Sequence, residues 1–571
     1  KAANHGINLG GNMKVAGNMV IKNVTNHGIV INGGSNDNVD NSSLIMGADE
    51  ENITGSILIY SDADESNVVH GIYNNASGVK IIANEISIND TKNTGLRFAG
   101  GNRLLEVKTK LTIEKVTASS QYGFTINSTN STAKVRDMEI KDINGTALYT
   151  RGTLIATGNV SIADAASNGV DLGGIMKVYG NLNIANVANH GVYFSVANSS
   201  LIMGEDEDNI TGDITITSNP ESPSIVHGIY NNAGNIKIVA NNITINGANN
   251  TALRFAGGNG VLEAKGKVTI ENMVTSGQYG FTLNSSNSTV KVRDMEIKKI
   301  SGTALYTRGT LIATGNVSIS DTTNHGVDLA SVMKVYGNLN ISNVTNHGIY
   351  FSVANSSLIM GEDEDNITGN IIITSNPQSP SIVHGIYNNN VSGIYIFAND
   401  ITINGTKNTA LRFVGGNGAV VAKGKITIEN VVTSGQYGIT VNNSTGQLMA
   451  RDIAIKNVNG VAIHNAGTTA ITGELVLENI TGNIFGTNSK LTLGTAIRTS
   501  KAINFSGTIT NTEAGSVEVA WIGDVGSGKT IAQCGNATLF NQCMNIFRPA
   551  DGFVLQQNGT TATNIDIVPA A

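Results

Sequence analysis

The stretch MKVYGNLNIANVANHGVYF, Met176–Phe194, returns almost unchanged as MKVYGNLNISNVTNHGIYF, Met333–Phe351. An earlier variant, MKVAGNMVIKNVTNHGIVI, occupies Met13–Ile31. Three histidines in the phrase HGIYNN keep the same spacing: His70, His227 and His384. Self-similarity at a fixed period is typical of repeat architectures. The sequence therefore contains three copies of one long repeat of about 157 residues.

Each long repeat divides into shorter units of about two dozen residues. Leu182 and Ile184 alternate with polar residues, and after an Asn/Gly turn Val192 and Phe194 do the same. Such alternation between tight turns is typical of short strands. Strands that recur at this period without intervening helices can pair in parallel with their equivalents in the next turn. The sequence therefore predicts an all-β, single-stranded parallel β-helix, a right-handed solenoid of about 20 rungs.

Asparagine and aspartate occupy the turn corners of this predicted solenoid. Asn23, Asn186 and Asn343 stand at equivalent corners, and Asp142 and Asp164 stand at corners of other rungs. These two residue types tolerate the left-handed backbone conformation and form local hydrogen bonds. We expect them to adopt that conformation and to bond along the stack.

Composition excludes several classes of protein. The 40% of hydrophobic residues is enough for a core, and only 14% of the residues are charged, so the chain is not disordered. A net charge of −7, with no basic cluster interleaved with aromatics, gives no support for nucleic-acid binding. No run of about 18 apolar residues is present, so we expect no membrane insertion.

The repeats define the expected domain organisation. Residues 1–509 are predicted to form the β-helical rod, with long repeats at about 13–175, 176–332 and 333–460 and degenerate rungs thereafter. Residues 510–571 contain the single tryptophan and both cysteines, and they are predicted to form a cap or junction.

The stacked phrases resemble those of secreted β-helical surface proteins of bacteria, namely autotransporter passengers and filamentous-haemagglutinin-like adhesins. The resemblance rests on Gly180–Phe194 and Gly337–Phe351, and on GTLIATGNVSI at Gly152–Ile162 and Gly309–Ile319. It covers nearly the whole chain, but it is one of pattern. It implies an extracellular rod that holds binding loops away from a cell, often without enzymatic activity.

Three acidic loops are the candidate metal sites. They interrupt the long repeats with the sequences GADEENITG and, twice, GEDEDNITG. Clustered carboxylate oxygens beside asparagine are ligands of the type that Ca²⁺ takes, although the spacing is not that of an EF-hand. A solvated charged loop is the competing interpretation. The candidate calcium ligands are Asp49, Glu50, Glu51, Glu205, Asp206, Glu207, Asp208, Glu362, Asp363, Glu364 and Asp365.

Most histidines of the chain precede a glycine at the start of a predicted strand. Other rungs hold asparagine, tyrosine or threonine there, which favours a turn role over a ligand role. His5 with His27, and His325 with His347, lie one rung apart and could share an ion. The residues that precede a glycine are His5, His27, His70, His190, His227, His325, His347 and His384.

Arginine and tyrosine also recur with the long repeat. A single active site is a unique constellation, so repetition favours a surface presented several times over an enzyme. Periodic sugar contacts and packing at the edge of the core are the two interpretations of these residues. They are Arg97, Arg254 and Arg412, and Tyr122, Tyr279 and Tyr437.

Two motifs near the C-terminal end point to chemistry. Gly523–Thr530 matches the phosphate-binding pattern G-x-x-x-x-G-K-[ST], but no helix-forming segment follows it, so we interpret it as a turn. Cys534 and Cys543 lack zinc-ligand spacing, so they are predicted to form a small local disulfide, with two free thiols as the alternative.

The sequence-based conclusion is an extracellular, non-enzymatic rod at a cell surface, an adhesin shaft or fibre component. It needs no cofactor other than the calcium considered above, and its expected partners are a surface receptor or glycan. The chain begins within a rung, so we expect further repeats or an identical subunit to cover that end. A filament subunit that stacks end to end, and a carbohydrate-binding or polysaccharide-degrading β-helix, are the alternatives.

Overall fold

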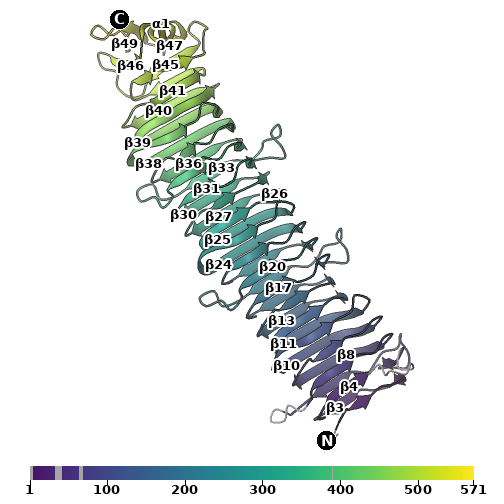
Figure 1. The fold of residues 1–571 in the computed structure, drawn as a ribbon. Coiled ribbons are helices and arrows are strands. Elements are labelled where there is room, and N and C mark those ends of the chain that lie inside the picture. Colours follow the sequence, from purple (N-terminus) through teal and green to yellow (C-terminus); the bar gives the residue numbers. More distant parts are fainter. Residues whose placement is uncertain (1–3, 32–40, 63–67, 389, 571) are drawn as a thin grey trace. The chain divides into compact units, whose positions relative to one another are not determined.

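The computed structural model describes residues 4–31, 41–62, 68–388 and 390–570. It is all-β with 2% helix, and its parallel stacked strands form a β-solenoid of about 20 turns. The prediction of a parallel β-helix is therefore confirmed. The chain divides into two compact units, Lys1–Arg293 and Asp294–Ala571. Figure 1 shows the strands of each unit following one another in chain order.

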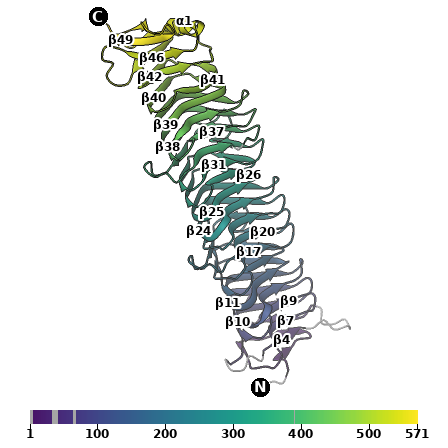
Figure 2. The same ribbon diagram turned by 60° about the vertical axis from the view of Figure 1, so that its left-hand side comes forward.

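Three strands make one turn of the solenoid in the first unit. β12 (Thr153–Ala156), β13 (Val160–Ala165) and β14 (Val170–Leu172) follow one another, separated by short corners. Each pairs in parallel with its equivalent in the next turn, so that Leu154 lies opposite Met176 and Ile162 opposite Ile184. The other strands of this unit are β1 (Ile7–Asn8), β2 (Asn12–Lys14), β3 (Met19–Lys22), β4 (His27–Ile31), β5 (Ser43–Ile45), β6 (Ile57–Tyr60), β7 (His70–Asn74), β8 (Lys80–Thr91), β9 (Leu96–Phe98), β10 (Leu104–Ile126), β11 (Thr132–Thr150), β15 (Ile175–Val178), β16 (Leu182–Ala185), β17 (His190–Phe194), β18 (Ser200–Ile202), β19 (Ile214–Thr217), β20 (His227–Asn231), β21 (Lys237–Ala240), β22 (Ile243–Asn246), β23 (Thr251–Phe255) and β24 (Val261–Leu283). Figure 2 shows paired strands of successive turns, such as β17 and β20, side by side.

The second unit repeats this arrangement. β26 (Thr310–Ala313), β27 (Val317–Thr322) and β28 (Val327–Leu329) pair in parallel with the next three strands along the chain. β25 (Thr289–Thr307) contains the division between the units. The other strands are β29 (Val332–Val335), β30 (Leu339–Val344), β31 (His347–Phe351), β32 (Ser357–Ile359), β33 (Ile371–Thr374), β34 (His384–Asn388), β35 (Tyr395–Ala398), β36 (Ile401–Thr406), β37 (Leu411–Phe413), β38 (Ala419–Val441), β39 (Gln447–Ile471), β40 (Glu474–Ile480), β41 (Phe485–Thr492), β42 (Ala496–Thr499), β43 (Ile503–Phe505), β44 (Thr508–Ile509), β45 (Val517–Trp521), β46 (Lys529–Cys534), β47 (Phe547–Pro549), β48 (Phe553–Gln557) and β49 (Asn564–Pro569).

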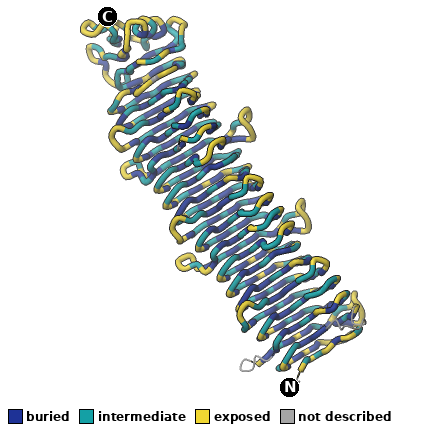
Figure 3. The backbone as a smooth tube through the Cα atoms, in the orientation of Figure 1, coloured by how far each residue is buried: buried dark blue, intermediate teal, exposed yellow. Residues whose placement is uncertain are grey.

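The core of each unit is a continuous stack of apolar side chains. Alternate residues point inward in many strands, as in β16, where Leu182 and Ile184 are buried and Asn183 between them is exposed. Figure 3 shows buried residues inside every turn and exposed residues concentrated in the loops. Phenylalanine recurs among the largest fully buried side chains: Phe98, Phe124, Phe194, Phe255 and Phe281 in the first unit, and Phe351, Phe413, Phe485 and Phe505 in the second.

The predicted corner conformation is confirmed. The φ angles of Asn23, Asp142, Asp164, Asn186 and Asn343 are 51°, 56°, 54°, 52° and 52°, all in the left-handed region. The Asn186 amide donates to Asp164 Oδ1 at 3.4 Å, from one turn to the previous one. Asparagine and aspartate recur at these corners because they adopt positive φ at small cost.

A close contact between two glycines explains why two phrases of the long repeat each keep a glycine. A Cβ on Gly212, which ends the phrase NITG, would collide with the backbone oxygen of Gly180, in the phrase VYG. Gly369 meets Gly337 in the same way in the second unit. Two backbone segments lie so close together here that no side chain fits between them.

Parallel stacking continues beyond Ile509. β45 pairs in parallel with β42, and β47 pairs with β45. A second sheet, in the order β43-β46-β49-β48, then includes antiparallel pairs. One helix, α1 (Ala537–Ile546), was not foreseen from the sequence, and it begins where Asn536 Oδ1 accepts a hydrogen bond from Leu539 N at 2.9 Å.

Candidate functional site

The acidic loops fold in the same way in each copy. An isolated antiparallel bridge closes each loop, between Gly47 and Ile53 and between Gly204 and Ile210 in the first unit. Within the second loop, Asp206 Oδ1 accepts hydrogen bonds from Asn209 N and from Asn209 Nδ2, both at 2.9 Å. These bonds lower the pKa of the Asp206 carboxyl. The equivalent bonds join Asp49 to Asn52 and Asp363 to Asn366.

Lysines of neighbouring turns hold these loops against the solenoid. Lys80 Nζ lies 2.7 Å from Glu50, and Lys237 pairs with Glu207. Lys177 Nζ donates to the backbone oxygen of Glu205 at 2.7 Å. Each loop is therefore an ordered projection with a defined conformation.

All eleven candidate calcium ligands are exposed. Among the described residues, no group of three or more His, Cys, Asp or Glu side chains is arranged to hold a metal ion. The central aspartate of each loop directs its oxygens at its own asparagine. The calcium site stays a prediction.

The histidines stack in columns at the start of the third strand of several turns. The rings of His5 and His27 lie 4.9 Å apart at 25°, and those of His325 and His347 lie 4.9 Å apart at 22°. The rings of each pair therefore stack nearly face to face. The sharing of an ion by these pairs stays a prediction.

Burial in these columns lowers the pKa of the imidazoles. Desolvation, then the proximity of His227 and Arg254, lowers the pKa of His190 to about 4. Desolvation also lowers the pKa of His227 to about 4, and its Nδ1 lies 3.1 Å from the carbonyl oxygen of Thr251. These histidines are neutral packing residues at neutral pH.

The three recurring arginines lie beside tyrosines. Arg97 stands over the ring of Tyr73 at 5.3 Å, and Arg254 stands over Tyr230 at 5.3 Å. Arg412 stands over Tyr387 at 5.4 Å in the second unit. Each pair is in register on adjacent turns, as Tyr230 is with Arg254. A guanidinium over an aromatic face is a cation–π contact, so at least part of the role of each arginine is packing.

A second cluster, around Asp171, was missed in the sequence. Asp171 lies in register between Tyr149 and Tyr193, and it accepts a hydrogen bond from Ser195. Arg151 stands 5.9 Å from the ring of Tyr149. Burial raises the pKa of the Asp171 carboxyl, although Ser195 and Arg151 oppose the shift.

The second unit contains the same arrangement. Asp328 lies between Tyr306 and Tyr350, and it accepts a hydrogen bond from Ser352 at 2.5 Å. Arg308 stands 5.9 Å from the ring of Tyr306. A clue was present in the sequence, because ALYTRGTLIATGNVSI occurs twice and each copy is followed by GVDL.

A pocket of about 490 Å³ opens beside Asp171. Its lining includes Tyr122, Asn144 and Asn168, and Asp171 is the one carboxylic acid among the described residues that line it. Tyr122 and Tyr149 pack with their ring centroids 5.5 Å apart. The pocket therefore offers aromatic faces, amides and hydroxyls, which are groups suited to binding.

Arg254, Tyr279 and Tyr437 were also considered as sugar contacts. Tyr437 packs against His464 with centroids 5.4 Å apart, and with Arg412 it lines a pocket of about 210 Å³. Tyr279 lies on β24, and it is partly exposed. Arg412 and Tyr437 therefore line the same pocket. Arg254 packs on the ring of Tyr230.

The phosphate-binding match is not a nucleotide site. Lys529 and Thr530 lie on strand β46, and the hydroxyl of Thr530 donates to Asp566 at 2.7 Å. A P-loop needs a helix directly after the glycine-rich turn, and here a strand follows. The motif is a turn between β45 and β46, as interpreted from the sequence.

The two cysteines lie next to each other as buried free thiols. A hydrogen bond between their side chains lowers the pKa of Cys534 and raises that of Cys543. Cys534 ends β46, and Cys543 lies on α1. The two cysteine side chains therefore lie in contact. The disulfide between them stays a prediction.

No protein-family model matches the chain, and neither a curated protein nor a solved structure matches it. The likeness to β-helical passengers therefore consists of the repeat pattern and the β-solenoid fold. In the described part of the chain, no helix has the length and apolar character required to cross a membrane.

Proposed function

We propose that the chain is an extracellular, non-catalytic β-helical rod, an adhesive or structural element of a cell surface. The observation that carries this proposal is the repeated display of one outer surface. Tyr149, Asp171 and Tyr193 in the first unit have the same register and contacts as Tyr306, Asp328 and Tyr350 in the second. A surface built twice from the same residues suits repeated, weak binding.

The ordered acidic loops support the same proposal. Their bridges and Asp–Asn bonds fix their backbones, and every carboxylate in them is exposed. Fixed loops lose little conformational entropy when a partner binds. They are the surfaces that we expect a receptor or glycan to contact.

The pocket beside Asp171 favours binding over hydrolysis. Glycoside hydrolases of the common kind need two carboxyl groups, one on each side of the scissile bond. Asp171 is the one carboxylic acid among the described residues that line this pocket. The partly buried carboxylate of Asp171 can accept hydrogen bonds from a ligand.

The test is binding of the labelled chain to immobilised glycans and extracellular-matrix proteins. We expect retention on at least one of them, reduced in the double variant Tyr149→Ala, Tyr306→Ala, with no release of reducing ends from any glycan. Release of reducing ends that is lost in Asp171→Asn would overturn the non-catalytic proposal. Asn93→Ala, in a corner outside this surface, is the control.

Electron microscopy of the purified chain separates the rod from the filament. Single particles whose length is independent of concentration support a rod. Threads that lengthen with concentration would establish end-to-end assembly instead. Protease treatment of intact source cells tests the extracellular location. We expect the protease to cleave the chain without lysis of the cells.

A further inference from the structure

The third long repeat differs from the other two on the outer face of the first strand in three adjacent turns, which contain β35, β38 and β39. The aligned phrases are KIIAN from Lys80, KIVAN from Lys237 and YIFAN from Tyr395. Lys80 and Lys237 pair with glutamates of the acidic loops. Tyr395 replaces them with a ring that is 41% exposed.

The neighbouring positions change in the same direction. Where the second repeat has Glu263 and Lys291, the third has Val421 and Met449. Glu263 forms an ion pair with Lys265 at 2.6 Å, whereas Met449 is 37% exposed to solvent. Exposed apolar side chains in place of charges are typical of a surface that binds something.

Register brings these replacements together in the second unit. Phe397 lies opposite Val421, which lies opposite Met449 on the next turn. The rings of Tyr395 and Phe397 are parallel, at 6° to each other, with centroids 6.4 Å apart. Three adjacent turns therefore present one apolar and aromatic stripe.

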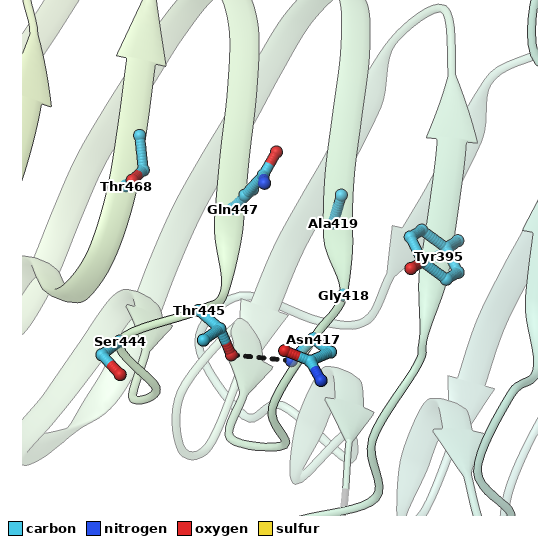
Figure 4. A pocket seen from close by; sticks show the side chains of 8 residues that line it. All are labelled: Tyr395, Asn417, Gly418, Ala419, Ser444, Thr445, Gln447 and Thr468. Carbon is cyan, nitrogen blue, oxygen red and sulfur yellow. Dashed lines mark hydrogen bonds between the residues drawn. The ribbon is translucent and has the colours of Figure 1, made fainter.

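A cleft of about 640 Å³ lies beside the Tyr395 ring. Tyr395 and Ala419 are partners on adjacent strands, and Gln447 is the partner of Ala419 on the next, as Figure 4 shows. The other copies have Leu104 and Val261 at the position of Ala419, so the smaller side chain leaves more space in this repeat. A smaller pocket of about 300 Å³ lies at the equivalent place in the first copy, where Lys80 and Leu104 line it. The larger volume of the cleft in the third copy accompanies the exchange of these two residues for Tyr395 and Ala419.

One edge of the cleft is polar and fixed in conformation. Thr445 Oγ1 accepts a hydrogen bond from Asn417 N at 2.9 Å (Figure 4), and it donates to Asn443 Oδ1 at 2.8 Å. The side chains of Asn417, Gln447 and Thr468 line the space with amide and hydroxyl groups. No described residue that lines the cleft is charged.

We propose that this Tyr395 cleft binds a neutral oligosaccharide. A pyranose ring has an apolar C–H face that packs on an aromatic ring, and its hydroxyls bond to amides and hydroxyls. The absence of charge among the described lining residues disfavours acidic glycans. Strands spaced by about 4.8 Å match successive sugar residues across the turns. The proposal rests on the adhesive function proposed above, and it names a ligand class for one repeat.

Affinity electrophoresis of the full chain through gels that contain neutral polysaccharides tests the proposal. We use a β-glucan, a xylan, a mannan and a galactan as probes. The wild type should be retarded by at least one probe, and Tyr395→Ala should lose that affinity by about tenfold or more. Ala419→Leu, which restores the residue of the first copy, should also weaken binding by filling the cleft. Glu263→Ala, which changes the second copy's equivalent of Val421, should leave binding unchanged.

The unfolding temperature of each variant establishes that it is folded. If Tyr395→Ala fails to fold, Ala419→Leu carries the test, and Tyr395→Phe, which keeps the aromatic face, should retain binding. No retardation by any probe, or retardation that Tyr395→Ala and Ala419→Leu leave intact, would overturn the cleft proposal. Retention on a glycan or matrix surface that persists in Tyr395→Ala would still support the adhesive function. Binding to peptides but to none of the polysaccharides would assign the cleft to a protein partner and refute a sugar ligand.

Discussion

His190 stacks on His227 of the next turn, with ring centroids 5.1 Å apart and an angle of 23° between the planes. Two imidazoles this close cannot both be charged without repulsion, and burial adds to the cost. The column extends to Tyr193 and Tyr230, whose rings also stack, 5.5 Å apart. The stack is therefore stable only while the histidines are neutral.

Acid should destabilise the first unit through its two histidine columns, His27–His70 and His190–His227. The pKa values of His27, His70, His190 and His227 are all lowered from 6.5 to about 4 in the folded chain. Between these values the unfolded chain binds more protons than the folded one. Stability is then complete above pH 6.5 and is lost as the pH falls toward 4. We expect the unfolding temperature to drop by about 5 to 10 °C over this range, as measured by circular dichroism.

The variant that checks this origin is His190→Asn combined with His227→Thr, since Thr251 follows His227 in the column. It should reduce the pH dependence by about half, because His27 and His70 remain. Tyr193→Phe, which retains both imidazoles, should keep the wild-type slope. An unchanged slope in the double histidine variant would assign the acid sensitivity to other groups.

Gly212→Ala should strongly destabilise the first unit. The new Cβ would overlap the backbone oxygen of Gly180, and a backbone atom cannot move aside as a flexible side chain can. We expect a loss of about 2 kcal/mol or more in the free energy of unfolding, measured in urea. Gly11→Ala, where nothing lies within 4 Å of the added carbon, is the control and should be near neutral. Equal stability of the two variants would contradict the close approach.

Asp206→Ala should loosen its loop without unfolding the unit. The Asp206 carboxylate closes the loop on Asn209, but it is fully exposed, so its loss has little effect on the core. Hydrogen exchange over residues 205–211 should speed up by about tenfold, while the unfolding temperature changes by less than about 2 °C. Asp208→Ala removes a neighbouring charge, retains the Asp206 contacts and should exchange like the wild type.

Calcium at millimolar concentration should leave the unfolding temperature unchanged. The carboxylate of Asp206 is engaged by Asn209 and that of Glu207 by Lys237. A ligand that binds only the folded state raises its stability in proportion to the logarithm of ligand concentration. A calcium-dependent rise that disappears in Asp206→Ala would instead establish the calcium site predicted from the sequence.

Oxidation should join Cys534 to Cys543. Their thiols are free, buried and in contact, so a mild oxidant should lower the mass of the tryptic peptide that contains both cysteines by two hydrogens. Closing so short a loop should stabilise the segment by about 2 to 3 kcal/mol. Cys534→Ala is the control and should show neither change. If the wild type retains two titratable thiols after oxidation, the disulfide prediction is wrong.

Much of the fold was predictable because its signals are periodic. The alternation at Leu182 and Ile184 predicted inward and outward positions, and both residues are buried. The corner residue Asn186 was expected in the left-handed region and has a φ of 52°. α1 was missed because its sequence, ATLFNQCMNI, has weak helix propensity, and its start depends on the Asn536 cap.

The candidate site was predictable only in part. Arg254 was singled out because it recurs, but its partner Tyr230 lies on the previous turn and was not linked to it. Asp171 attracted no attention, because its tyrosine neighbours are each about one turn away in sequence. Such contacts follow from the register between turns, which the sequence does not state directly.

The sequence by itself determined the β-solenoid, its corners and its three long copies. These are local properties that repeat along the chain, namely alternation of period two and turn residues at fixed intervals. Only the tertiary structure decided which outer side chains meet, such as Asp171 with Tyr149 and Tyr395 with Ala419. The physical reason is that stacking places residues of successive turns about 4.8 Å apart, and small changes in corner length shift every outer contact.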